Sequence, residues 1–240
     1  MPLPPIDTIL KHFSANHALH IRPTYLQTLL TSLASQRQIP TGPALFGWLK
    51  FRILSSDITD SLQPYANLCF PVNITDGDVQ STPLPGPVAV QVVGIEDMGT
   101  SKFNQIDRIE MGERGEFMKG KEVIRVVPEE EGDEGVSGGA LGRPRVATAK
   151  TGPHKLLVED AGGRGVYGIE LHDIQGVHVD MPMGTKQMVL KNVTVCRGVL
   201  LLAPANTLVL GGKVETLNQQ YLANRKQVLK AALEKLRPQS

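Results

Sequence analysis

Cysteine is scarce in this sequence, because only two of its 240 residues are cysteines. A disulfide framework is therefore excluded as the basis of the fold. Cys69 and Cys196 each lie in an apolar or strand-like stretch without a partner at metal-ligand spacing, so we expect two buried free thiols. No apolar run approaches the roughly 20 residues that cross a bilayer, and residues 1–11 resemble neither a signal peptide nor an anchor. We expect a globular protein of the cytosol or the nucleus.

Aromatic residues and excess charge are also scarce. Aromatic side chains make up 5% of the chain, and the formal net charge is +1. A protein that holds nucleic acid on its own normally carries a basic surface and, for single strands, aromatic side chains on which bases stack. Any direct grip on DNA is therefore expected to be weak and to depend on a partner. With 41% hydrophobic residues, the chain can bury the core of one domain or slightly more.

Helical spacing of apolar side chains dominates residues 5–64 and predicts a small three-helix bundle within residues 1–64. Pro23 suits the first turn of the second helix, and the break at residues 39–43 precedes the third. The apolar positions are Ile6, Ile9, Leu10 and Phe13, then Leu26, Leu29, Leu30 and Leu33, and finally Leu45, Phe46, Trp48, Leu49 and Ile53. A proline-rich stretch at residues 82–87 stiffens the approach to the next part.

The second part, residues 65–212, has the pattern of an all-β domain. Its strand-like runs are residues 87–94, 153–159, 166–171, 186–195 and 199–203. Turn sequences such as Ala161-Gly-Gly-Arg-Gly165 separate them. Five short strands of this kind fit a Greek-key barrel of the OB type. An amphipathic helix within residues 213–240, expected to pack back on the barrel, completes an α+β fold.

A long insertion at residues 107–152 separates the first two predicted strands. It is polar and rich in glycine, with an acidic run at residues 129–134 and a basic stretch at residues 143–150. Several apolar residues lie between residues 116 and 127, where a purely solvated loop would be uniformly polar. Long loops are usually functional or disordered, and an apolar patch flanked by charge indicates a segment that orders on a protein partner. A disordered loop with incidental apolar content is the alternative.

The carboxy-terminal helix has a surplus of basic residues. Its cations are Arg225, Lys226, Lys230, Lys235 and Arg237, set against Glu234. Favourable interaction with the negative end of the helix explains part of this surplus. Contact with DNA or with a partner protein is the alternative.

Catalytic and ligand-binding patterns are weak throughout the chain. His12, His17 and His20 have no supporting carboxylate or cysteine at ligand spacing, so a solvated or partly buried helix face is favoured over a metal site. The glycine-rich turn at residues 161–165 lacks the ending of a phosphate-binding loop and opens a strand, so it predicts a hairpin. The acids Asp97, Glu159 and Asp160 are interpreted as solvated strand-end residues. We expect no enzyme activity, no cofactor and no small-molecule substrate.

Three stretches resemble a known family. They are Val90-Gln-Val-Val-Gly-Ile-Glu-Asp-Met98 with Lys102-Phe-Asn-Gln-Ile106, then Pro182-Met-Gly-Thr-Lys186, and Cys196-Arg-Gly-Val-Leu-Leu-Leu-Ala-Pro-Ala-Asn206 ending in Val209-Leu-Gly-Gly-Lys-Val214. Trp48-Leu49 and Ile53-Leu-Ser-Ser-Asp-Ile-Thr-Asp60 resemble the helical motif of the same family, with one extra residue. The family is that of RecQ-mediated genome instability protein 1, an OB-fold subunit that works with topoisomerase III and a RecQ helicase.

The resemblance implies a short, non-catalytic, nuclear member of this family. It implies that the protein binds a type IA topoisomerase III, has a RecQ-family helicase as second partner, and promotes decatenation and dissolution of double Holliday junctions. In the family, the long loop between the first two barrel strands reaches into the topoisomerase gate and favours its open state. DNA would be bound weakly or through the complex.

The residues expected to contact topoisomerase III lie mainly in the insertion. They are Phe117, Met118, Ile124, Arg125, Val126, Arg143, Arg145 and Lys150, together with Lys186, Asp57 and Asp60 outside it. Lys186 carries over from the family's Pro-x-Gly-Thr-Lys motif, and a solvated residue after a turn is its alternative interpretation. Two alternatives exist for the whole chain: a stand-alone OB module that binds single-stranded DNA, and a scaffold that only bridges helicase and topoisomerase.

Overall fold

The computed structural model describes residues 4–35, 40–114, 152–189 and 193–235. The chain forms two compact units. The first contains residues 1–99 and 152–225, and the second contains residues 100–151 and 226–240. We describe each unit by itself, and the predicted division into residues 1–64, 65–212 and 213–240 stays a prediction.

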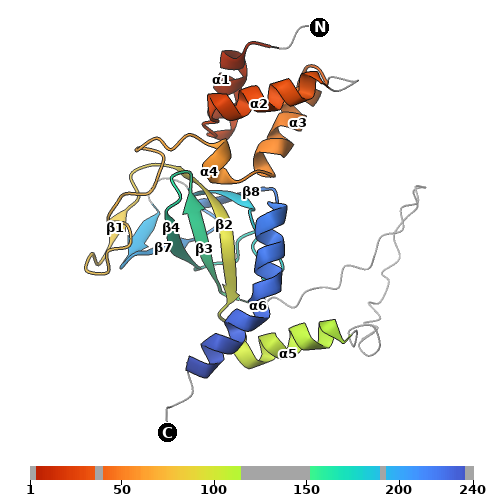
Figure 1. Cartoon of the computed structure of the whole chain (residues 1–240). Coiled ribbons are helices and arrows are strands. Elements are labelled where there is room, and N and C mark those ends of the chain that lie inside the picture. The colour runs from red at the N-terminus through yellow and green to blue at the C-terminus, as the bar shows by residue number, and fades with distance from the viewer. Residues whose placement is uncertain (1–3, 36–39, 115–151, 190–192, 236–240) are drawn as a thin grey trace, which may run out of the picture. The chain divides into compact units, whose positions relative to one another are not determined.

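The helical bundle of the first unit confirms the predicted three helices and adds a short fourth (Figure 1). The helices are α1 (Ile6–His17), α2 (Pro23–Ala34), α3 (Pro43–Leu54) and α4 (Ile58–Ser61). Proline occupies the first turn of α2 and of α3, where its missing N–H costs no hydrogen bond. Side chains at helical spacing, including Ile9, Phe13, Leu26 and Leu49, form one buried core.

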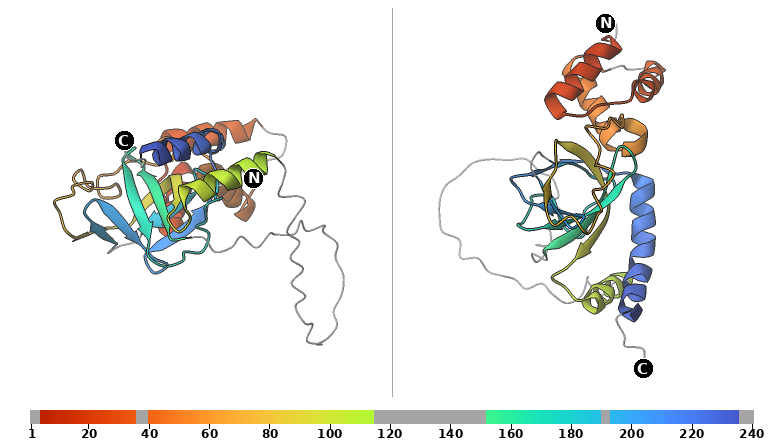
Figure 2. Two further views of the ribbon diagram at one scale, coloured as in Figure 1. Left: turned by 90° about the horizontal axis from the view of Figure 1, so that it is seen from below. Right: turned by 90° about the vertical axis from the view of Figure 1, so that its left-hand side faces the viewer.

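The barrel confirms the predicted OB fold, and its strands curl around in the right-hand view of Figure 2. The strands are β1 (Thr82–Pro83), β2 (Val88–Asp97), β3 (His154–Asp160), β4 (Gly165–Glu170), β5 (Lys186–Val189), β6 (Thr194–Cys196), β7 (Val199–Leu202) and β8 (Thr207–Gly211). Their order is β1-β6-β7-β4-β3-β2-β5-β8. The pairing of β4 with β7 is parallel and every other pairing of these strands is antiparallel.

Alternation along the strands builds the barrel core. In β3, every second side chain from His154 to Asp160 is buried, as expected for a strand with one face inward. Inward-facing residues of several strands, including Val90, Val158 and Leu200, share a second core that is separate from the bundle core. The hairpin predicted at residues 161–165 is present, because β3 pairs with β4 and the Asp160 N–H donates to the Arg164 oxygen over 3.2 Å.

Helix α5 (Lys102–Glu113) corrects the prediction that residues 107–152 form one loop, because residues 107–113 are helical. The Ser101 hydroxyl caps this helix by accepting the Asn104 N–H over 3.2 Å. No glycine or proline interrupts residues 102–111, so helix formation meets no break until Gly112.

Helix α6 (Glu215–Lys235) begins in the first unit and ends in the second. In the first unit, Leu217 and Tyr221 pack against the barrel core, and the Tyr221 hydroxyl donates to the Ile95 oxygen over 2.7 Å. In the second unit, Lys226 and Lys230 form ion pairs with Glu110 of α5. Pairing with acids of α5 therefore accounts for part of the basic surplus seen in the sequence.

Candidate partner-binding site

The barrel holds the two ends of the insertion together at one point. The Met98 N–H donates to the Pro153 oxygen over 2.9 Å. A Cβ atom added to Gly99 would lie 2.5 Å from the Gly152 oxygen, so the two backbones touch at a glycine. Residues 100–151 therefore leave and re-enter the barrel through neighbouring backbones, where β2 ends and β3 begins.

A buried pair fixes the strand that re-enters the barrel. The His154 Nδ1 and Glu170 Oε2 atoms lie 2.6 Å apart, and both side chains are buried. Glu170 also accepts the His154 N–H over 3.2 Å and the Ile174 N–H over 2.8 Å. These charge-assisted bonds attach the first residue of β3 to the end of β4, which makes the base of the insertion rigid.

Most predicted contact residues of the insertion fall outside the described residues. These are Phe117, Met118, Ile124, Arg125, Val126, Arg143, Arg145 and Lys150. Their role as partner contacts stays a prediction.

Lys186 is buried, with 2% of its surface exposed, so it is not the solvated residue that one interpretation expected. Its ammonium donates to the Ser56 oxygen and, over 2.9 Å, to the Gly184 oxygen. Ser56 lies between α3 and α4, so the lysine joins the barrel to the bundle. Its predicted contact with topoisomerase III stays a prediction, and in this structure its ammonium points inward.

Asp57 lies beside this lysine and caps α4. Its Oδ1 atom accepts the Thr59 N–H over 2.9 Å and the Thr59 hydroxyl over 2.7 Å. Burial acts to raise the pKa of Asp57, but the hydrogen bonds from Thr59 and Gln91 and the charge of Lys186 outweigh it, so the pKa lies below its ordinary value. Asp60 is exposed on the same helix and remains accessible to a partner.

Parts of the stretches that resemble the family, together with the helical motif, meet around Lys186. The Thr185 hydroxyl donates to the Pro182 oxygen over 2.6 Å and to the Gly212 oxygen over 3.1 Å. The Val214 N–H donates to the Met183 oxygen over 3.0 Å. Residues 182–186, 210–214 and 53–57 thus form one contact region between barrel, bundle and the start of α6.

The charge of Lys186 makes folding stability depend on pH. Burial lowers the pKa of Lys186 to about 8, and the charge of Asp57 offsets this only in part. Between pH 8 and the pKa of an unfolded lysine, near 10.4, the side chain is protonated in the unfolded chain but largely neutral in the folded one. The free energy of unfolding therefore rises with pH over this range, by about 3 kcal/mol in total. We expect Lys186→Met to lose this rise, as measured by urea unfolding at pH 7.5, 9 and 10.

The difference between wild type and Lys186→Met isolates the lysine. Burial raises the pKa of Tyr221 and, together with the charge of Asp160, that of Cys69. Because these pKa values are raised, ionisation of either group destabilises the folded protein as the pH rises, which is opposite to the effect of Lys186. This effect is the same in the wild type and in the variant. Parallel stability curves for wild type and variant would contradict the assignment.

Asp97 and Asp160 are buried, so the expectation that these strand-end acids are solvated was wrong. Asp97 accepts the Gly99 N–H over 2.8 Å at the base of the insertion. Asp160 accepts the N–H groups of Phe70, Gly162 and Arg164 over 2.7, 2.9 and 2.9 Å. Carboxylates that accept backbone N–H groups are stable in the interior, and the sequence alone does not show which acids find such donors.

The two cysteines are partly exposed, so the expectation that both are buried was wrong. Cys69 and Cys196 lie at the borders of the barrel rather than in its centre: Cys69 packs against the bundle core, and Cys196 ends β6.

The outer face of β3 and β4 offers little to single-stranded DNA. Tyr167 is 48% exposed there, and the Lys155 ammonium lies 4.3 Å from its ring centroid. However, Lys155 also lies 3.8 Å from a carboxylate oxygen of Glu96, whose negative charge partly offsets the attraction of this lysine for a phosphate. One aromatic side chain and one ion-paired lysine make a poor platform for stacked bases and phosphates.

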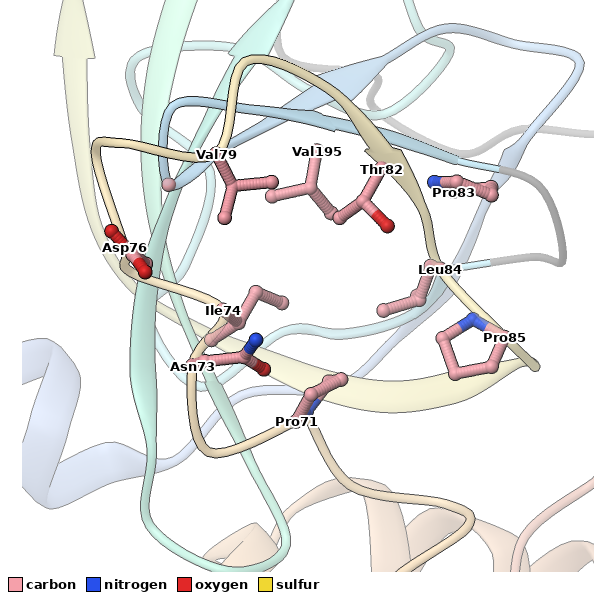
Figure 3. Close-up of a pocket in the computed structure, with 11 residues that line it drawn as sticks. Pro71, Asn73, Ile74, Asp76, Val79, Thr82, Pro83, Leu84, Pro85 and Val195 are labelled. Carbon is pink, nitrogen blue, oxygen red and sulfur yellow. The ribbon is translucent and has the colours of Figure 1, made fainter.

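A pocket that the sequence did not reveal lies beside β1 and β6 (Figure 3). Its volume is about 320 Å³. Figure 3 shows Ile74, Val79, Leu84 and Val195 pointing into the hollow, with Asp76 at its edge. The lining is mainly aliphatic and comes largely from residues 71–85, so the pocket suits an apolar group and has no arrangement for catalysis.

The described residues carry neither a metal-binding cluster nor a membrane-spanning helix. No group of three or more His, Cys, Asp and Glu side chains there is placed to hold a metal ion. No described helix is long and apolar enough to cross a membrane. His12 instead stacks on Phe46, with ring centroids 4.1 Å apart.

These features define an OB-fold protein with a helical bundle and an insertion held between its first two barrel strands. Comparison with known sequences shows which family of OB-fold proteins this chain resembles. The family model described as "RMI1, N-terminal OB-fold domain" matches residues 70–225. The chain is 31% identical over 213 residues to RecQ-mediated genome instability protein 1 of Schizosaccharomyces pombe, which covers 86% of this chain and 88% of that protein.

Vertebrate relatives of the same name are longer. Identity is 28% over 177 residues with the Danio rerio protein and 32% over 174 residues with the Xenopus laevis protein. These matches cover 74% and 72% of this chain, but only 30% and 25% of those relatives. The chain belongs to the RecQ-mediated genome instability protein 1 family.

Proposed function

We propose that this protein is a non-catalytic, nuclear accessory subunit of a type IA topoisomerase III, and that it acts with a RecQ-family helicase in genome stability. In this complex it promotes decatenation and the dissolution of double Holliday junctions. Family membership supports the link to RecQ. The finer role rests on the insertion.

One observation carries the proposal. Residues 100–151 leave and re-enter the barrel through the contact between Gly99 and Gly152, and Gly152 lies next to the His154 ring of the His154–Glu170 pair. A rigid base of this kind holds both ends of a long segment, so contacts made by that segment act on the partner through the barrel. The segment itself contains apolar residues between acidic and basic runs, a composition suited to a protein partner.

The mechanism is a shift between two states of the topoisomerase. An insertion that contacts the topoisomerase only when the gate is open must favour the open state. A difference of about 1.4 kcal/mol in binding between the two states would change the open-to-closed ratio roughly tenfold. Apolar contacts by Phe117, Met118 and Ile124 would supply this difference.

Decatenation of linked single-stranded circles by the cognate topoisomerase III tests the proposal. The informative variant replaces residues 116–150 by a Gly-Ser linker of equal length, which keeps α5 and its ion pairs. We expect the wild-type chain to stimulate decatenation and the variant to lose about tenfold of that stimulation. Gel filtration of each chain with the topoisomerase shows whether binding persists.

A second variant tests the apolar residues of the insertion alone. It keeps residues 116–150 but changes Phe117, Met118, Ile124 and Val126 to serine. Loss of stimulation in both variants, with binding retained, would support gate control. If both variants stimulate decatenation as strongly as the wild-type chain, the protein only bridges helicase and topoisomerase.

A further inference from the structure

Helix α3 carries a large apolar side chain on its outer side as well as apolar side chains on its inner side. Leu45, Leu49 and Ile53 pack into the bundle core, while Phe51 on the outer side is 65% exposed. A large apolar side chain exposed among aromatic and charged neighbours can mark a surface that another protein covers. No described segment covers Phe51, so this side of α3 is a candidate docking surface.

Phe51 lies on α3 with Trp48 and Arg52, and we call these three residues and Tyr25 the aromatic face. Trp48 and Tyr25 are only partly exposed, because each also packs against the bundle core. The Arg52 guanidinium carbon lies 5.8 Å from the Trp48 ring centroid. The Tyr25 hydroxyl of α2 donates to the Arg52 oxygen over 3.4 Å. Tryptophan, tyrosine and arginine are the residues that most often dominate the binding energy of protein interfaces.

The charge and shape around this face indicate what it binds. Helix α2 carries no charged residue, and α3 carries Lys50 and Arg52 without an acid. Ala44 and Gly47 are exposed on α3, and a Cβ atom added to Gly47 would meet nothing within 4 Å. Small residues let another helix approach closely, and the two cations would complement acids on that helix.

The aromatic face and the base of the insertion belong to opposite ends of the first unit (Figure 1). The bundle meets the barrel where the Ile58 N–H donates to the Gln91 side chain over 3.1 Å. Strand β2 continues from Gln91 for six residues to Asp97, a rise of roughly 20 Å. A protein on the aromatic face therefore leaves the base of the insertion free for a second partner.

We propose that the aromatic face binds an amphipathic helix with acidic flanks, supplied by the RecQ-family helicase of the same complex. This inference rests on the proposed function, because it assigns the helicase to a surface that the topoisomerase does not need. Trp48 and Phe51 pack against the apolar side of the helix, and Lys50 and Arg52 pair with its acids.

The test compares the affinity of the full chain for the cognate helicase and for topoisomerase III. Phe51→Ala is expected to weaken helicase binding about tenfold, the loss typical of an interface anchor. Arg52→Glu is expected to weaken it further than Arg52→Ala, because it opposes acids on the partner. Val72→Ala, which truncates an apolar side chain that is 85% exposed, is the matched control and leaves binding unchanged.

Topoisomerase binding and stimulated decatenation are expected to survive all of these variants, which separates this inference from the proposed function. Unchanged helicase affinity in Phe51→Ala and Arg52→Glu, or no helicase binding by the wild type, would overturn the inference. Loss of topoisomerase binding in the same variants would also overturn it, by assigning the face to that enzyme. Trp48 is the single tryptophan of the chain, so quenching of its fluorescence by a dT30 oligonucleotide would make the face a DNA site instead.

Discussion

Replacing Gly212 by alanine is expected to lower the free energy of unfolding by about 4 kcal/mol. Gly212 has a φ of +97°, and an added Cβ atom would lie 2.8 Å from the carbonyl carbon of Leu54 and closer still to its oxygen. The clash sets barrel backbone against bundle backbone, and neither can move without breaking the contact region around Lys186. Thermal unfolding would show a fall in Tm of about 10 °C.

Gly211 provides the control for this prediction. Its φ is +87°, but an added Cβ atom would have nothing within 4 Å. Gly211→Ala therefore carries the backbone strain without the clash and is expected to cost about 1 kcal/mol. Equal losses in the two variants would show that strain alone matters and that the approach of Leu54 does not.

Asp160→Ala is expected to cost a similar amount, about 4 kcal/mol. The carboxylate is 1% exposed and accepts the N–H groups of Phe70, Gly162 and Arg164. Alanine leaves the buried Phe70 N–H without its acceptor, and it removes the bonds to the part-buried N–H groups of Gly162 and Arg164 that hold the hairpin. Denaturant unfolding, with an unchanged slope against denaturant, measures the loss.

Two further variants show whether the hydrogen bonds carry this effect. Asp160→Asn keeps an oxygen for Gly162 and Arg164 but turns an amide toward Phe70, so about 2 kcal/mol is expected. Asp76 accepts the Asp78 N–H over 2.9 Å in an exposed turn, where water can replace it. Asp76→Ala is therefore expected to change stability by less than about 0.5 kcal/mol. A loss in Asp160→Asn as large as in Asp160→Ala would contradict the account.

Local patterns were sufficient to predict the bundle and most of the barrel. Apolar spacing in α1 to α3 and turn residues such as those at 161–165 act within a few positions of the chain. Strands β1 and β8 were missed, and the single strand predicted at residues 186–195 corresponds to β5 and β6. Strand β1 is two residues long, contains Pro83 and pairs with Thr194 and Val195 of β6. Nothing near Thr82 in the sequence signals that pairing.

The same limit applies to the contact region around Lys186. Lysine is rarely buried, and its burial here depends on carbonyl groups of Ser56 and Gly184, the first of them 130 positions away along the chain. The family motif at residues 182–186 singled out Lys186 but did not show that its side chain is buried. The aromatic face was also missed, because Trp48 follows the same helical spacing as the core residues beside it.

The open time of the topoisomerase gate tests the central claim most directly. Single-molecule extension of one topoisomerase III on stretched single-stranded DNA would record open and closed states with and without this protein. We expect the wild-type chain to raise the open-to-closed ratio about tenfold, and the variant with the Gly-Ser linker at residues 116–150 to bind without changing that ratio. An unchanged ratio with the wild-type chain bound, or an equal rise with both chains, would contradict gate control by the insertion.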